Sequence, residues 1–252
     1  MNNFSAPLLE VKNISKYFGR VAASININFI VEENEIVGLV GDNGAGKSTL
    51  IKILSGVIEP DKGKIYWKGL LQKNYSFKKA KKNGITTVFQ DRALVEQHSI
   101  WRNIFMGREI TNFLGIVNVK KEKEESLKLM KEQMKFTSKF VTPDNIVGNM
   151  SGGEKQGVAI SRALFFDSNL IILDEPTAGL SLGETTKVLS FIGDIKRFGK
   201  SCIFITHNLY HVYPIADKIV IVDRGKIAGS YEKNKISIEE LENIMRKITS
   251  DK

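Results

Sequence analysis

The sequence predicts an α/β fold in which a helical subdomain is inserted into the chain. Two observations support this fold class. Short apolar segments of strand length alternate with helical segments in the first and last parts of the sequence. The middle of the chain, residues 91–165, changes character and is rich in Lys, Glu and Met. A length of 252 residues is long for one core and short for two full domains, so we expect one core with an insertion.

The first ninety residues should form an N-terminal antiparallel β subdomain and the first part of the core. Residues 24–30 alternate apolar and polar side chains, the pattern of a strand with one buried face. Residues 36–40 are almost continuously apolar, which is typical of a strand covered on both faces of its sheet. A glycine-rich turn and a helix over 47–55 should follow. Three further strands are expected, at residues 8–14, 63–68 and 85–89.

The inserted segment, residues 91–165, should be a helical subdomain. Leu127, Met130 and Met134 recur at helical spacing within it. We interpret these side chains as positions that pack into a core.

The last part of the chain, residues 166–252, should complete the core, so that 1–252 form a single domain. Strands are expected at 170–173, 202–206, 219–222 and 227–231. The last two flank a short turn, 223–226, and read as a hairpin. Ser237 and Glu240 form a capping box ahead of a C-terminal helix. The apolar stripe of this helix should pack on the domain's own surface, with a partner-binding helix as the alternative; it consists of Ile238, Leu241, Ile244, Met245 and Ile248.

Composition indicates a cytoplasmic chain. No apolar run approaches the roughly 20 residues that cross a bilayer, and the N-terminus lacks the layout of a secretory signal. A single cysteine, Cys202, cannot form an internal disulfide, which agrees with a reducing compartment. The net charge of +9 could indicate a nucleic-acid partner, but many lysines lie in Lys/Glu-rich stretches such as 120–135, typical of solvated helix faces. A modest basic excess also suits a polyphosphate ligand or a nearby anionic membrane surface.

A glycine-rich loop between the strand at 36–40 and the following helix carries the motif G-x-x-x-x-G-K-[ST]. Its glycines allow backbone conformations in which consecutive N–H groups face phosphate oxygens, and the helix N-terminus adds partial positive charge. Lys47 can reach the β- and γ-phosphates, and the Ser48 hydroxyl can bind Mg²⁺. The motif predicts that the chain binds a nucleoside triphosphate. The predicted nucleotide-binding residues of this loop are Gly41, Asn43, Gly44, Ala45, Gly46, Lys47, Ser48 and Thr49.

Two acids follow the apolar strand at 170–173, where ligands of open α/β sheets gather. Asp174 should hold Mg²⁺ opposite Ser48. Glu175 should point elsewhere and polarise the attacking water, a contribution of about 10²–10⁴-fold to the rate. The strand at 202–206 ends at His207, which we interpret as a contact to the γ-phosphate. The predicted catalytic residues are Glu175, His207 and Lys47.

Residues 150–156 read Met-Ser-Gly-Gly-Glu-Lys-Gln and lie just ahead of the strand that leads to Asp174. They resemble the ABC signature, usually written L-S-G-G-Q. The phosphate loop, Gln90, the segment 174–177 (Asp-Glu-Pro-Thr) and His207 accompany it in the order typical of ABC ATPases. The resemblance covers nearly the whole chain, and it implies a P-loop NTPase core of the ABC type.

The resemblance also implies a mechanism and further site residues. Two cassettes would pair head to tail around two ATP molecules, with Ser151, Gly152 and Gly153 binding the γ-phosphate held by the other subunit. Tyr17 matches the aromatic residue that stacks on adenine in this family. Gln90 matches the hinge glutamine that contacts Mg²⁺ and links the helical subdomain to the membrane partner. ATP and Mg²⁺ are therefore the expected cofactors.

Within the family, the chain looks most like the ATPases of monosaccharide importers. This likeness rests on residues 41–44, 105–110, 156–159 and 206–208. It implies an ATPase on the cytoplasmic face of the membrane, paired with itself or a related chain and bound to permease subunits that a solute-binding protein supplies. An importer of another solute such as nucleosides is one alternative. A soluble ABC protein acting on nucleic acid or the ribosome is another, although we expect no direct nucleic-acid contact.

Three residues depart from the family pattern. Met150 and Glu154 replace the usual Leu and Gln of the signature, and Ser181 stands where an Asp usually follows Leu180. The signature changes should be tolerated, because the expected phosphate contacts come from other residues. The change at Ser181 bears on how tightly the two ATP sites of a dimer are coupled.

Overall fold

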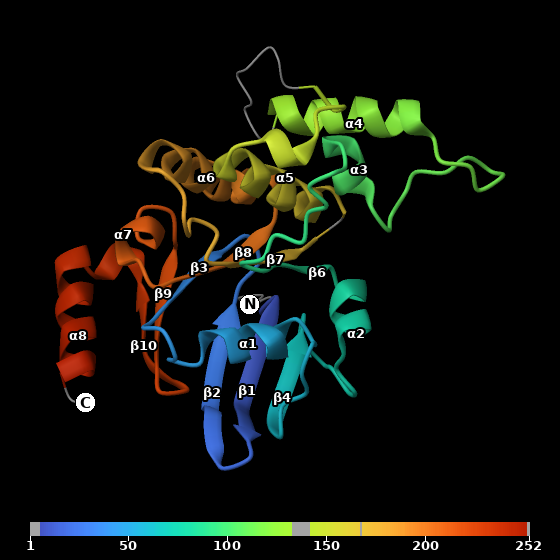
Figure 1. Ribbon diagram of the computed structural model, residues 1–252. Helices are drawn as coiled ribbons and strands as arrows, with labels where there is room; N and C mark the ends of the chain where they lie inside the picture. Colours follow the sequence, from blue (N-terminus) through green and yellow to red (C-terminus); the bar gives the residue numbers. More distant parts are fainter. Residues whose placement is uncertain (1–5, 133–141, 167, 251–252) are drawn as a thin grey trace, which may run out of the picture.

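The computed structural model describes residues 6–132, 142–166 and 168–250, and within them the strands form two sheets (Figure 1). The first sheet has the order β2-β1-β4-β5 and is antiparallel, as predicted for the N-terminal part. Its strands are β1 (Leu9–Phe18), β2 (Val21–Val31), β4 (Lys62–Trp67) and β5 (Leu70–Leu71). The second sheet has the order β10-β9-β3-β8-β7-β6. Its strands are β3 (Ile36–Val40), β6 (Ile85–Val88), β7 (Leu170–Asp174), β8 (Ser201–Thr206), β9 (Lys218–Asp223) and β10 (Lys226–Glu232).

Helices cover both faces of the second sheet. The α-helices are α1 (Lys47–Leu54), α2 (Phe77–Lys82), α3 (Ile100–Phe105), α4 (Val119–Glu132), α5 (Gly152–Phe165), α6 (Leu182–Asp194), α7 (Leu209–Val212) and α8 (Ile238–Ser250). Short 3-10 helices are η1 (Val147–Asn149), η2 (Ile195–Phe198) and η3 (Lys233–Lys235).

The parallel strands β9, β3, β8, β7 and β6 form the centre of the fold. Every residue of β3 and of β8 is buried, as the continuous apolar run at 36–40 predicts. Successive side chains point to opposite faces, so Val37 and Leu39 pack with α1 and the first sheet, whereas Ile36 and Val40 pack with α5 to α8. The result is a layered α/β fold in which the central strands carry their C-terminal ends to one edge.

The helical segment has a core of its own. Ile104 and Phe105 of α3 pack with Met130 of α4 and Val158 of α5. The predicted division of the chain at 90/91 and 165/166 agrees with this separate cluster and stays a prediction.

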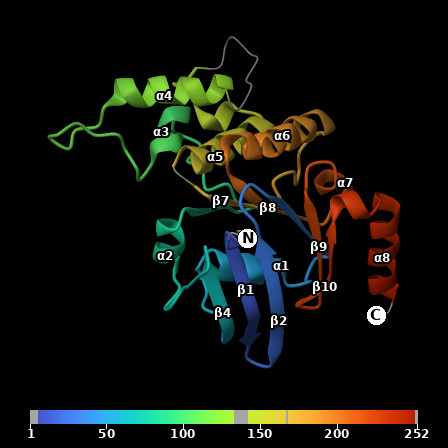
Figure 2. The same ribbon diagram turned by 180° about the vertical axis from the view of Figure 1, so that it is seen from behind.

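One part of the predicted helical segment is not helical. Residues 106–118, between α3 and α4, project away from the rest of the chain on the side opposite α8 (Figure 2). Gly107 and Gly115 adopt positive φ angles of 73° and 78°, which end helical geometry. The Asn112 side chain also accepts hydrogen bonds from the backbone N–H groups of Leu114 and Ile116, and this local bonding competes with a helix.

The helical spacing within α4 predicted only some of the residues that are buried in this helix. Met130 is buried as expected, but Leu127 is 36% exposed, and the neighbouring Leu129 is buried instead. Met134 lies outside the described residues.

The C-terminal predictions are confirmed. The Ser237 hydroxyl accepts from the N–H of Glu240, and the Glu240 carboxylate accepts from the N–H of Ser237. Leu241 is fully buried, and the other residues of the stripe pack against the core cluster that contains α5 to α7. Strands β9 and β10 form the predicted hairpin around Arg224 and Gly225, both with positive φ.

Among the described residues, no helix combines the length and apolar character that crossing a bilayer requires.

Candidate functional site

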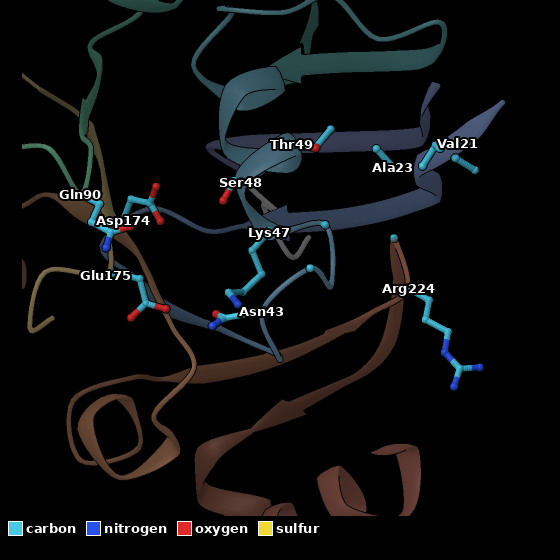
Figure 3. Close-up of a pocket in the computed structure, with 14 residues that line it drawn as sticks. Val21, Ala23, Asn43, Lys47, Ser48, Thr49, Gln90, Asp174, Glu175 and Arg224 are labelled. Atoms are coloured by element: carbon cyan, nitrogen blue, oxygen red, sulfur yellow. The ribbon is translucent and has the colours of Figure 1, made fainter. Parts of the chain in front are cut away.

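A cavity of about 400 Å³ opens where the central strands end (Figure 3). It lies beside the loop that joins β3 to α1, with the acidic end of β7 on one side and the β9–β10 turn on another. Its lining residues are Val21, Ala22, Ala23, Asn43, Gly44, Gly46, Lys47, Ser48, Thr49, Gln90, Asp174, Glu175, Arg224 and Gly225.

The phosphate loop depends on glycine at two positions that the motif specifies. Gly46 has a φ of 102°, and a Cβ there would lie 2.7 Å from the carbonyl oxygen of Ala23. A Cβ on Gly41 would lie 2.2 Å from the carbonyl oxygen of Val222. No real Cβ tolerates either approach, so only glycine lets the loop fold tightly between β2 and β9. The loop therefore brings its backbone close to the cavity, together with the side chains of Lys47 and Ser48 (Figure 3).

Lys47 lies within this loop and is only 7% exposed. Its ammonium donates hydrogen bonds to the carbonyl oxygens of Gly41 at 2.6 Å and Asp42 at 2.9 Å. Burial lowers the pKa of Lys47, while the nearby carboxylates of Glu175 and Asp174 oppose that effect. The geometry holds a cation at the cavity floor, where it can attract a polyphosphate (Figure 3).

Three oxygen-bearing side chains, of Ser48, Gln90 and Asp174, line the same cavity from different elements. Ser48 belongs to α1, Gln90 follows β6, and Asp174 ends β7. Burial raises the pKa of Asp174, and the neighbouring Glu175 adds to the rise, whereas Lys47 lowers it. Hydroxyl, amide and carboxylate oxygens are the donors that Mg²⁺ accepts in proteins, so this set fits that ion.

Glu175 has a strained backbone, with a φ of 46°. Its N–H donates to the carbonyl oxygen of Ile205 on β8, and its carboxylate is held by two residues at the end of that strand. The Thr206 hydroxyl donates to Oε2 at 3.1 Å, and the backbone N–H of His207 donates to Oε1 at 3.0 Å. The His207 ring Nδ1 also lies 2.9 Å from Oε1. The side chain of Glu175 is therefore fixed at the edge of the cavity.

His207 is not among the lining residues, and its side chain is more than half exposed. A second histidine lies behind it: His211 Nδ1 is 3.0 Å from the Thr177 hydroxyl, and Nε2 is 3.1 Å from the side-chain nitrogen of Asn208. Burial lowers the pKa of His211, and His207 lowers it further, against an opposing effect of Glu175. These contacts fix the turn that carries His207.

Ser151, Gly152 and Gly153 lie at the N-terminus of α5 and not among the residues lining the cavity. Ser151 caps the helix: its hydroxyl accepts from the N–H of Glu154, and the Glu154 carboxylate accepts from the N–H of Ser151. Glu154 therefore provides the capping contact at the position where the signature usually has Gln. A Cβ on Gly153 would lie 2.9 Å from Cβ of Glu184, so glycine permits α6 to approach this end of α5.

Tyr17 does not line the cavity, but its strand neighbour does. It pairs with Ala22 across the β1–β2 hairpin, and Ala22 does line the cavity. The Tyr17 ring is 41% exposed, and its backbone N–H donates to Asp61. The predicted adenine contact stays a prediction.

Two groups of lining residues were not predicted from the sequence. One is Val21, Ala22 and Ala23 at the start of β2; the other is Arg224 and Gly225 in the β9–β10 turn. The N–H of Gly225 donates to the Ala45 carbonyl at 2.8 Å, and the N–H of Ile25 donates to the Gly225 carbonyl at 2.7 Å. In Figure 3, Arg224 and Ala23 lie on one side of the view, and Gln90 and Asp174 lie on the other. A two-residue turn of non-glycine and glycine predicts a hairpin, but nothing in it predicts a contact with the phosphate loop.

Comparisons with known proteins agree with this geometry. The sequence profile described as "ABC transporter" matches residues 25–178. The xylose/arabinose import ATP-binding protein of Sulfolobus acidocaldarius is 42% identical over 240 residues, covering 94% of this chain and 93% of that protein. The fructose import ATP-binding protein of Rhizobium meliloti is 38% identical, covering 87% and 86%. The ribose import ATP-binding protein of Caldanaerobacter subterraneus is 35% identical, but this chain spans only 47% of its length.

Solved structures give the same result. The ADP conformation of an ATP-binding cassette from an ABC transporter has a TM-score of 0.81 and 26% identity, covering 98% of both chains. A nucleotide-free cassette has a TM-score of 0.79 and 26% identity, covering 95% of both chains. The family profile covers more than half of this chain, and the first relative matches nearly all of it. The chain therefore belongs to the ABC transporter family, as one of its ATP-hydrolysing cassettes.

Proposed function

We propose that this chain is the subunit that hydrolyses ATP to power the import of a monosaccharide through membrane partners. The observation that carries the proposal is the convergence of Lys47, Ser48, Asp174 and Glu175 on one cavity from two separate places in the chain, the start of α1 and the end of β7. A cation, two oxygen ligands for a metal and a positioned carboxylate are the groups that phosphoryl transfer to water requires.

The phosphate loop binds the triphosphate. Its N–H groups and the N-terminus of α1 face the phosphate oxygens, with glycines at positions 41, 44 and 46, and the buried ammonium of Lys47 contacts the β- and γ-phosphates. Asn43, Ala45 and Thr49 complete the loop's contacts. Tyr17, on the hairpin whose Ala22 lines the cavity, stacks on the adenine.

Ser48, Asp174 and Gln90 would hold Mg²⁺ through their side-chain oxygens. When bound, the ion neutralises charge that builds on the β- and γ-phosphate oxygens during transfer. Asp174 is suited to this role, because its raised pKa reflects a buried carboxyl that a cation would stabilise in its ionised form.

Glu175 acts on the attacking water. One water oxygen bonds to the γ-phosphorus while the bond to the ADP oxygen breaks, and the proton of the water passes to the Glu175 carboxylate. Thr206 and His207 hold that carboxylate through hydrogen bonds to both of its oxygens, which fixes its direction. His207 contributes a second contact, to the γ-phosphate.

The site is completed by a second cassette, either another copy or a related chain. Ser151, Gly152 and Gly153 of each subunit bind the γ-phosphate held by the other. A hydroxyl and two glycine N–H groups at the N-terminus of α5 form a suitable anion site. Closure follows ATP binding because the closed state makes more contacts with ATP than the open state does.

The cassette works at the cytoplasmic face of the membrane, where the helical segment, proposed as residues 91–165, transmits closure to permease subunits. Gln90 lies immediately before that segment and also lines the cavity, which supports its role as the link. A solute-binding protein delivers the cargo to the permease. No contact with nucleic acid belongs to this mechanism.

The cargo is proposed from the relatives. Import ATP-binding proteins for xylose/arabinose, fructose and ribose match this chain over most of its length. A nucleoside importer is the second candidate, because the nucleoside import ATP-binding protein of Lactococcus lactis is 34% identical and matches 94% of this chain.

The test is a pull-down of the tagged chain from gently solubilised membranes of its source cells, with partners identified by mass spectrometry. We expect a multi-span permease and a solute-binding protein that binds a labelled monosaccharide. A binding protein that retains nucleosides and no sugar would favour the second candidate. Ribosomal or DNA-bound proteins without a permease would overturn the transport function and leave the ATPase chemistry intact.

A further inference from the structure

One carboxylate joins the N-termini of α5 and α6. Oε1 of Glu184, which belongs to α6, accepts from the backbone N–H of Gly153 on α5 at 3.0 Å. Oε2 accepts from the backbone N–H of Ser181 at 3.0 Å and from the Ser181 hydroxyl at 2.8 Å. A hydrogen bond from the Ser151 side chain adds to these contacts. Both oxygens of Glu184 are thus used, one on each helix.

Glu184 is an anion at every physiological pH. The hydrogen bond from Gly153, followed by those from Ser181 and Ser151, lowers its pKa to about 2. Donated hydrogen bonds produce this shift by favouring the charged form over the neutral acid. The N-terminus of α5 therefore already holds a full negative charge that comes from its own chain.

Two of the donors that hold Glu184, the Gly153 N–H and the Ser151 hydroxyl, are also γ-phosphate contacts in the proposed ATP mechanism. Gly153 has one backbone N–H, and a well-formed hydrogen bond from it goes to one acceptor at a time. The γ-phosphate of a paired cassette would need this N–H and the Ser151 hydroxyl. It would also approach a carboxylate of the same charge sign, and like charges at this distance repel.

The fit between the two helices makes the contact specific. A Cβ on Gly153 would lie 2.9 Å from Cβ of Glu184, and one on Gly152 would lie 2.9 Å from Cδ2 of Leu180. The glycines of the signature thus let α6 lie so close to α5 that the Glu184 side chain reaches the N–H of Gly153. Glu184 can release Gly153 while Oε2 keeps its contacts with Ser181, so release does not require α6 to lose its cap.

We propose that Glu184 is an autoinhibitory residue: its carboxylate occupies the anion site of the signature, and the γ-phosphate of a second cassette must displace it before the two cassettes close. This inference rests on the proposed function, because the competing phosphate arrives only in an ATP-bound pair. Glu184 lies outside the ATP cavity of its own subunit. Its displacement sets the ATP concentration at which pairing begins.

Glu184→Gln separates the charge from the cap. Gln keeps the length of the side chain and one acceptor oxygen, and it serves at the third helical position of a capping box as Glu does. The matched control is Glu154→Gln, because Glu154 occupies the equivalent position of α5 and its carboxylate accepts from Ser151, the cap residue of its own helix. Both substitutions remove one negative charge near the same helix end.

The experiment measures ATP-dependent pairing by sedimentation velocity, in the Glu175→Gln background so that hydrolysis does not remove the nucleotide. Each protein is titrated with ATP and Mg²⁺, and thermal melting checks that the variants remain folded. We expect Glu184→Gln to lower the ATP concentration for half-maximal pairing by about three- to tenfold, as loss of a charge-assisted competing contact predicts. We expect Glu154→Gln to shift it much less, because this substitution removes a similar charge but Glu154 does not occupy the Gly153 N–H.

The possible outcomes distinguish the role of Glu184 from the ATP-dependent pairing of two cassettes. If the Glu175→Gln background pairs with ATP but Glu184→Gln leaves the half-maximal concentration unchanged or raises it, Glu184 is only a structural contact and the inference is wrong. An equal shift with Glu154→Gln would also overturn it, because general charge would then explain the effect. If the background never pairs at any ATP concentration, the proposed sandwich mechanism fails, and the inference fails with it.

Discussion

His207 contacts Glu175 twice, through its backbone N–H at 3.0 Å and its ring Nδ1 at 2.9 Å, and both contacts reach the same oxygen, Oε1. The backbone contact depends only on where β8 ends, whereas the ring contact depends on the side chain. A substitution of His207 therefore removes one contact and keeps the other, which makes the role of the ring measurable.

His207→Ala should lower the ATP turnover number by about 10²-fold, because the Glu175 carboxylate and the γ-phosphate each lose a positioned contact. ATP affinity should change little, since the phosphate loop is untouched. Phosphate release measured under saturating ATP gives the turnover number, and equilibrium titration gives the affinity. His98→Ala, in the helical segment, is the matched control and should retain wild-type turnover. Unchanged turnover in His207→Ala would show that Glu175 needs no support from the ring.

Gly46→Ala should remove nucleotide binding and destabilise the fold by about 1–3 kcal/mol, because its φ of 102° is strained for any residue with a Cβ. The new Cβ would also lie 2.7 Å from the Ala23 carbonyl. Gly183→Ala is the control: Gly183 is helical, and apart from the nearby backbone of its own helix no atom of the described residues lies within 4 Å of the position its Cβ would take. It should be neutral or stabilising by up to roughly 1 kcal/mol. Urea unfolding compares the two variants, and equal stabilities would contradict the strain at Gly46.

Arg224→Ala should weaken ATP binding by roughly two- to fivefold, the range expected for a single cation that is largely solvated. Its side chain is 58% exposed and lines the cavity on the Ala23 side. Calorimetric titration at low and high salt should show the difference shrinking as salt screens the charge. Lys226→Ala removes a cation two residues away that does not line the cavity, and it should have no effect. Equal effects of both substitutions would mean that only net charge matters.

His211 should make stability dependent on pH. Its folded-state pKa lies below the ordinary value of 6.5, mainly because it is buried, so protons bind the unfolded chain more readily than the folded one. The contribution of neutral His211 is fully present above the unfolded pKa and is lost as the pH falls below it. In the wild type, the urea midpoint should decrease as the pH is lowered from about 8 to 5. His211→Gln should flatten this dependence, and an identical slope in the two proteins would contradict the assignment.

The sequence predicted those parts of the site that are continuous in the chain. Residues 41–49 form the loop between a buried strand and a helix, as the motif requires, and Asp174 and Glu175 end a buried strand. The predicted capping box of Ser237 and Glu240 forms, and the boxes at Ser151 and Ser181, which were not predicted, follow the same local pattern of a serine and a glutamate three residues on. Such patterns depend on neighbours in the sequence and can be read from it.

Contacts between distant segments could not be predicted in this way. Arg224 reaches the cavity only because Gly225 bonds to Ala45, and the contact between Glu184 and Gly153 exists only because α5 and α6 pack closely. Residues 106–118 were expected to be helical, but two glycines with positive φ and the Asn112 side chain give an extended arm. In each case tertiary packing or a local side-chain contact decides the outcome, and periodicity does not report it.

In the proposed mechanism ATP joins two cassettes, and Glu175 then drives ATP hydrolysis. The most direct measurement is light scattering of the purified Glu175→Gln variant with and without ATP and Mg²⁺, together with its rate of phosphate release. We expect a stable ATP-bound dimer and a rate about 10²–10⁴-fold below the wild type, because binding is intact and general-base assistance is lost. A protein that stays monomeric at saturating ATP, or that still hydrolyses ATP at the wild-type rate, would contradict the account.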